Sequence, residues 1–126
     1  PDAPALAAHD PAIRDVILQQ IDAFGRGDDA AAFAFAAPDI QAQFLGPEVF
    51  IAMVKAHYRP VYTAQKVAFP EPAQAIEDRP ETRVQRVYIT DRRGRNTHAR
   101  YIMQKQPDAS WKIAGCQLIE TDQLDI

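Results

Sequence analysis

The feature that most constrains this chain is a change in the spacing of its apolar residues. In the first half they recur every three or four positions, which is the period of an amphipathic helix. The clearest stripe is formed by Ile13, Val16, Ile17, Ile21 and Phe24. In the second half, segments rich in β-forming residues alternate apolar with polar side chains, which is the period of a strand. Helices followed by strands predict an α+β domain, with N-terminal helices packed on one face of an antiparallel sheet.

Capping residues set the expected ends of the first helices. Asp10 is a suitable N-cap for a helix that Gly25 and Gly27 end. Asp28 caps a second, short helix over residues 30–37. The start of each helix, and the end of the first one, is therefore predicted from residues next to it in the sequence.

Prolines bound the last helix. Pro47 suits a first helical position, because its missing N–H would have no partner there. Arg59 precedes Pro60 and is therefore disfavoured in helical geometry. The helix is predicted to end near His57 or Tyr58, followed by a link to the first strand.

Turn residues divide the second half into a meander of strands. The predicted strands are residues 66–69, 82–90, 97–105 and 111–119, with residues 73–81 a loop or an irregular edge strand. Gly94 lies in the hairpin between the second and third of these. Gly115 marks a bulge in the last strand.

The length of 126 residues predicts one domain. We assign residues 10–119 to it, residues 1–9 to a flexible N-terminal segment and residues 120–126 to an acidic C-terminal tail. Residues 1–8 are mostly small, as is typical of the segment after a removed signal peptide. We therefore expect an exported or periplasmic protein. A trimmed cytoplasmic protein is the alternative.

Charge and residue counts narrow the classes of partner. The net charge of −3 argues against nucleic acid as a partner. No apolar run reaches the roughly 18 residues of a membrane span. The three histidines show no ligand spacing and Cys116 is the single cysteine, so we expect no metal site and no disulfide. Glycine-rich phosphate loops are missing, and we expect no cofactor.

Several segments resemble a known family. These are "FAFAAPDIQAQF", "GPEVFIAMVKAHYRPVY", "VQRVYITDRRGR" and "DASWKIAGCQLI". They resemble a bacterial family, domain of unknown function 4864, within the nuclear transport factor 2-like (SnoaL-like, cystatin-like) superfamily. The resemblance implies a cone-shaped α+β fold with a curved sheet and a pocket between helices and sheet. It also implies export and homodimers through the outer sheet face, and no known activity.

Seven residues are candidates for the wall of that pocket. They are Gln43, Met53, His57, Tyr58, Tyr62, Tyr101 and Trp111. His57 could act as a general base and a tyrosine could donate to an oxyanion. A core or rim position is the alternative for each of these. Trp111 is also predicted to pack in the core against Ile17, Ile21 and Phe24.

We favour a non-catalytic module that binds a small ligand or a protein. Between residues 82 and 119 the only acids are Asp91 and Asp108, and both lie in predicted turns. The alternative is a cofactor-independent lyase, isomerase or hydrolase that uses His57 with Tyr58 or Tyr62.

Neighbouring strands suggest a ligand and an assembly. Arg86 and Arg100 could jointly bind a carboxylate, so the ligand is expected to be apolar or a carboxylate. Val84, Tyr88 and Ile102 give the outer face a partly apolar character, which favours a homodimer.

Overall fold

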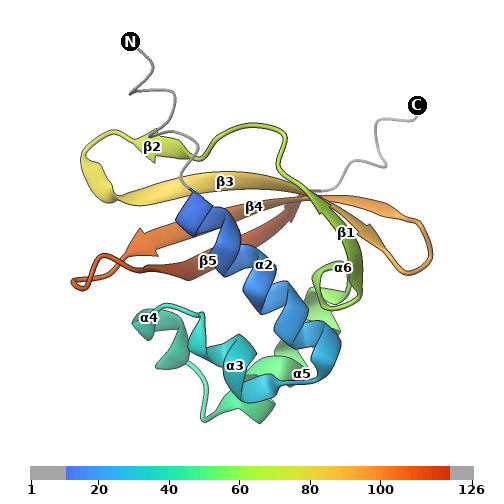
Figure 1. The fold of residues 1–126 in the computed structure, drawn as a ribbon. Coiled ribbons are helices and arrows are strands. Elements are labelled where there is room, and N and C mark those ends of the chain that lie inside the picture. The colour runs from blue at the N-terminus through green and yellow to red at the C-terminus, as the bar shows by residue number, and fades with distance from the viewer. Residues whose placement is uncertain (1–10, 120–126) are drawn as a thin grey trace.

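The computed structural model describes residues 11–119, and its helices all precede its strands (Figure 1). The helices are α2 (Pro11–Arg26), α3 (Asp29–Ala34), α4 (Pro38–Gln41), α5 (Pro47–His57) and α6 (Arg59–Tyr62). They lie on one side of the sheet. The predicted α+β architecture is confirmed. The assignments made for residues 1–9, Asp10 and residues 120–126 lie outside the described residues.

The helix boundaries follow from local chemistry. The Asp28 carboxylate accepts a hydrogen bond from the Ala31 N–H at 3.1 Å and so caps α3, as predicted. Gly27 before it has a φ of 71°, in the left-handed region that glycine occupies without strain. The helix α5 ends at His57, also as predicted.

The helix α6 differs from the expected link. Pro60 disfavours helical geometry at Arg59 but is well placed in the first turn of a new helix. The backbone N–H groups of Val61 and Tyr62 both donate to the Tyr58 carbonyl, at 3.0 and 3.1 Å. Pro60 therefore restarts a helix here instead of opening a loop.

Five antiparallel strands form the sheet. They are β1 (Ala64–Ala68), β2 (Gln74–Ile76), β3 (Arg79–Asp91), β4 (Asn96–Lys105) and β5 (Trp111–Ile119). The order across the sheet is β1-β3-β4-β5, and β2 pairs with the first part of β3. The prediction placed the start of β1 two residues late and the start of β3 three residues late. Pro80 is tolerated in β3 because it lies near the first residue of that strand, where the sheet begins.

The bulge predicted in the last strand is present. Ile102 pairs with Gly115 and Met103 pairs with Ile113, which leaves Ala114 without a partner on β4. Beyond it, residues 115–119 pair with β4 in unbroken register.

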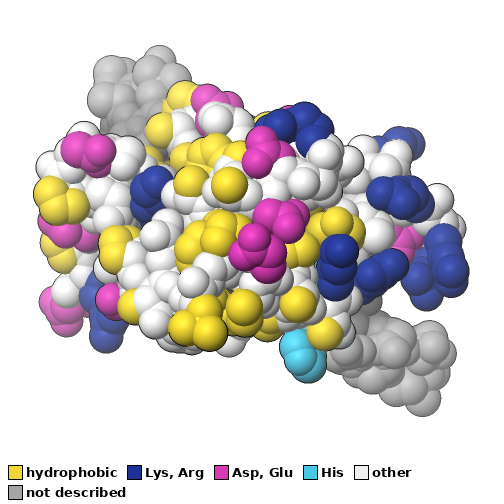
Figure 2. Space-filling view, turned by 90° about the horizontal axis from the view of Figure 1, so that it is seen from below, with side chains coloured by type: hydrophobic (Ala, Val, Ile, Leu, Met, Phe, Trp, Pro, Cys, Tyr) yellow, Lys and Arg dark blue, Asp and Glu magenta, His cyan; other side chains and the backbone are white. Residues whose placement is uncertain are grey.

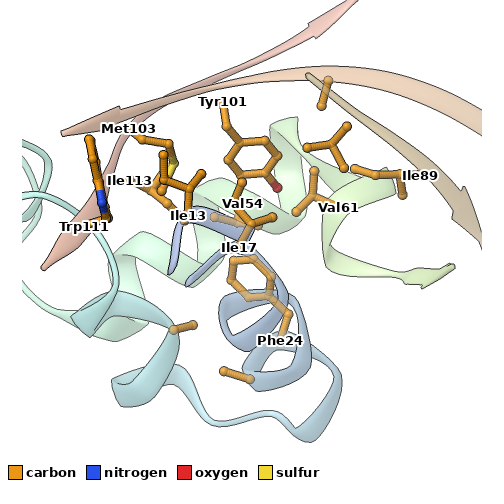
Figure 3. Close-up of a cluster of buried hydrophobic side chains, with 14 of the residues drawn as sticks. Ile13, Ile17, Phe24, Val54, Val61, Ile89, Tyr101, Met103, Trp111 and Ile113 are labelled. Carbon is orange, nitrogen blue, oxygen red and sulfur yellow. The ribbon is translucent and has the colours of Figure 1, made fainter. Parts of the chain in front are cut away.

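The core lies between the sheet and α2, with contributions from α5 and α6 (Figure 3). Alternate residues of β3 and β4 face it, and Val87, Ala99 and Met103 are fully buried. Trp111 is buried as predicted, but its predicted neighbours were partly wrong. It lies beside Met103 and Ile113, whereas Phe24 lies apart from it, below Ile17 in Figure 3.

Candidate functional site

A cavity of about 530 Å³ lies between the helices and the β5 side of the sheet. Its helical wall comes from α2, α4 and the loop after it, α5 and α6, and its sheet wall comes from β4 and β5. Its volume falls within the range of roughly 300–1,000 Å³ that is usual for small-molecule sites.

The lining of the cavity is apolar and uncharged. Aromatic and aliphatic side chains make up most of it, among them Phe24, Phe44, Phe50, Met53, Val54 and Val61. Among the described residues, none that lines it is an Asp, Glu, Lys, Arg or His. A charged ligand would lose its hydration there without gaining a partner, whereas an apolar one would gain by burial.

Ring contacts hold the helical wall together. The Phe50 ring from α5 lies 5.2 Å from that of Phe33 and 5.5 Å from that of Phe44, measured between centroids. These tilted and edge-on geometries are favourable for aromatic pairs. The loop after α4 is thereby anchored through Phe44, while the adjacent Leu45 is 99% exposed.

The polar groups of the cavity fall into two sets. Gln20 is buried, and its side-chain amide donates to the Ala32 carbonyl at 3.1 Å, so it is occupied in holding α2 to α3. Gln43 and Gln117 are exposed, on opposite walls. The Gln43 amide is free to meet a polar end of a ligand. The Gln117 side chain is not, because it pairs with Arg100 on the outer face of the sheet and its amide oxygen accepts a hydrogen bond from Arg100 at 3.3 Å.

Tyr101 and Cys116 are cross-strand neighbours at the floor of the cavity. Tyr101 is 1% exposed and its hydroxyl makes no hydrogen bond of regular geometry, although the Cys116 thiol lies beside it. Burial raises the pKa of the Tyr101 hydroxyl well above its usual value, and the neighbouring thiol adds to the effect. Cys116 as a whole keeps some surface in solvent, yet burial raises the pKa of its thiol to about 12. Neither group ionises near neutral pH.

Four of the seven candidate residues line the cavity. They are Gln43, Met53, Tyr58 and Tyr101. The other three lie outside it, for separate reasons. His57 ends α5 and is exposed. The Tyr62 ring packs 5.7 Å from that of Phe24, with the Lys55 ammonium over it at 5.3 Å.

Trp111 lies outside the cavity because it occupies the far end of β5. Its indole is buried, with the Arg83 guanidinium 5.7 Å and the Lys105 ammonium 5.9 Å from the ring centroid. These two cation–π contacts close one end of the core.

Arg86 and Arg100 face each other on the outer face of the sheet, away from the cavity. Arg86 lies 3.6 Å from the Glu71 carboxylate, and its Nε donates to Nε2 of His98 at 3.0 Å. Burial and the charges of the two arginines lower the pKa of His98. The expected carboxylate site therefore does not coincide with the cavity.

The sequence reasoning missed Gln20 and the β5 residues 115–117. Gln20 carried a usable signal, because it continues the buried stripe of α2 at the spacing of Ile13, Ile17 and Phe24. A polar residue on a buried stripe needs a partner, and here the partner belongs to the next helix. Residues 115–117 gave no such signal, since their role follows from their place at the sheet margin.

The family model described as "Domain of unknown function (DUF4864)" matches residues 6–126. The chain belongs to the DUF4864 family. No curated protein matches the sequence of this DUF4864 protein. None of the helices within residues 11–119 is long and apolar enough to cross a membrane. Over the same residues, no three His, Cys, Asp or Glu side chains are grouped to hold a metal ion.

Proposed function

We propose that this DUF4864 protein is a non-catalytic module that binds a small, uncharged, apolar ligand in the cavity. The observation that carries the proposal is a ligand-sized cavity whose described lining contains no charged side chain. The exposed amide of Gln43 in its lining suits a ligand with one neutral polar end.

The same lining argues against the enzyme alternative. Acid–base catalysis near neutral pH needs a group that titrates there, and His57 lies outside the cavity. The lining offers the hydroxyls of Tyr58 and Tyr101 and the Cys116 thiol. With a pKa near 12, Cys116 carries almost no thiolate for nucleophilic attack.

The proposal is tested with three probes that share an eight-carbon chain: an alcohol, an amine and a carboxylate. Thermal shifts and chemical-shift perturbation in NMR spectra should detect the alcohol and neither ion. Equal binding of all three, or of none, would contradict the proposal.

A pair of substitutions on α5 localises the binding. Met53→Lys puts a charge into the cavity wall and should abolish alcohol binding. Ala52→Lys makes the same change at the adjacent, exposed position and should leave binding intact. Circular dichroism of both variants shows whether each is folded.

We further propose that the DUF4864 family belongs to the nuclear transport factor 2-like superfamily. Its support is the arrangement of helices on one face of an open antiparallel sheet, which is compatible with the cone of that superfamily.

Export and a homodimer through the outer face are proposed on the same resemblance. Tyr88, which is 47% exposed on that face, is the residue to change. Light scattering should give a dimer mass for the wild type and a monomer mass for Tyr88→Lys, and a wild-type monomer would contradict the dimer.

A further inference from the structure

We infer that the free edge of β5, residues 115–119, binds an extended peptide whose apolar side chain enters the cavity. This deepens the proposed function, on which it rests, by naming the class of ligand. The mode is addition of a strand to a sheet edge, in which backbone hydrogen bonds supply affinity and a side-chain pocket supplies specificity.

The edge is unoccupied by the described part of the chain. The strand β5 is last in the order of the sheet, so only one of its sides pairs with β4. Within residues 11–119, no backbone hydrogen bond from outside the sheet reaches residues 115–119. Every second residue of that stretch therefore presents an N–H and a C=O away from β4, as edge strands do.

The two edges of the sheet differ in how they are protected. The opposite edge carries Lys66 in β1, and Pro70 and Pro72 after it. Lysine, proline and short strands are the usual devices against pairing with another chain. Residues 115–119 read Gly-Cys-Gln-Leu-Ile, without a charge or a proline, and their register is unbroken.

The chain itself shows that β5 accepts a further strand. The segment before α4 pairs with Ile113 in the parallel sense. The Ala37 N–H donates to the Ile113 carbonyl at 2.8 Å, and the Ile113 N–H donates to the Phe35 carbonyl at 2.9 Å. Pro38 then begins α4 and the chain leaves the edge. A peptide on residues 115–119 would continue the added strand where the protein's own segment ends.

The cavity lies on the side of the sheet to which such a peptide would present a side chain. Cys116 pairs with Tyr101 on the inner face, and Gly115, Cys116 and Gln117 all line the cavity. Residues paired across neighbouring strands point to the same face. A peptide residue opposite Cys116 would therefore point toward the uncharged cavity, so that residue should be apolar.

The test uses the full chain, labelled with ¹⁵N, and a blocked pentapeptide of threonine with a central phenylalanine. Its binding should slow hydrogen exchange at alternate amides within residues 115–119. A central alanine should weaken binding tenfold or more, because most of the buried apolar area is lost. Methylation of the peptide's edge-facing nitrogens should weaken it about tenfold, through lost hydrogen bonds.

The cavity variants separate this inference from the proposed function. Met53→Lys should weaken binding of the pentapeptide at least tenfold, and Ala52→Lys should leave it unchanged. If the eight-carbon alcohol binds and the pentapeptide does not, the peptide inference fails while the cavity proposal stands. If the pentapeptide binds without protecting these amides, the edge is not its site and the inference fails. If neither probe binds, both proposals fail.

Discussion

Neighbouring residues of β4 lie in opposite surroundings. Tyr101 and Met103 are almost fully buried under the helices, whereas Arg100, the residue directly before Tyr101, is exposed. Because side chains of a strand alternate between faces, one residue of sequence separates the core from solvent. The inner face should therefore determine stability, while the outer face carries charge that changes stability little.

The outer face nevertheless has an internal order. Arg86 is shared between Glu71 and His98, and the Tyr88 ring meets that of His98 edge-on at 4.8 Å. Around the β3–β4 hairpin, Lys and Arg side chains gather at one end of the molecule (Figure 2). The helix side in the same view is a mixture of apolar and charged side chains. Charged side chains thus occur on the helix side as well as around the hairpin, but none of the described residues that line the cavity is charged.

The largest expected difference between the faces concerns two aromatic residues. Trp111→Ala removes a side chain that is 6% exposed and should lower the free energy of unfolding by about 3–5 kcal/mol. Tyr88→Ala, on the outer face, should cost less than about 1 kcal/mol. Urea melts measure both. Similar losses for the two variants would break the comparison.

The second prediction moves a thiol from one face to the other. Burial raises the pKa of Cys116 from 9.0 to about 12, which lowers its thiolate fraction at pH 8 about a thousandfold. Alkylation of the native protein at pH 8 should be slower than that of the unfolded chain by about this factor. The double variant Cys116→Ser with Gln117→Cys carries its thiol at an exposed position and should react at nearly the unfolded rate. Fast alkylation of native Cys116 would show that its thiol is not enclosed.

The third prediction concerns the tyrosine hydroxyl on the inner face. Tyr101→Phe removes a buried hydroxyl without a regular hydrogen bond and should leave stability unchanged or raise it by up to about 1 kcal/mol. The matched variant Tyr88→Phe, at an exposed ring, should have no measurable effect. A loss above about 1 kcal/mol in Tyr101→Phe would mean that its hydroxyl has a strong partner, with the Cys116 thiol the nearest candidate.

The smallest effect is a pH dependence that arises on the outer face. The folded protein holds the pKa of His98 below its usual value of about 6.5, chiefly through burial and then through Arg86 and Arg100. The unfolded chain therefore binds this proton more readily. The contribution of His98 to the free energy of unfolding is complete above about pH 6.5 and is lost as the pH falls below that value.

Urea melts of wild type and His98→Gln between pH 5 and pH 7.5 measure this effect. As the pH is lowered from 7.5 to 5, the free energy of unfolding of the wild type should fall by more than that of the variant. Equal slopes for the two proteins would contradict the role of His98. Arg86→Gln should raise the pKa of His98, as followed by NMR titration of the imidazole.

The sequence alone determined the class of fold and most element boundaries. Asp28 caps a helix because its carboxylate needs only the next three residues. His57 ends one because Pro60, three residues on, disfavours helical geometry at Arg59. The bulge near Gly115 and the alternation of β4 were also predictable. These features depend on contacts within a few residues, or on the period of a strand, and a sequence carries that information directly.

Only the tertiary structure decided which residues share the cavity. The cavity is lined by four of the predicted residues, Gln43, Met53, Tyr58 and Tyr101. The other three, His57, Tyr62 and Trp111, lie outside it. Helical periodicity fixes which face of a helix is buried, but not how far along the sheet that helix is placed, so Trp111 was predicted to pack against Phe24, from which it lies apart. The free edge of β5 likewise follows from strand order, which depends on pairings between residues far apart in the chain.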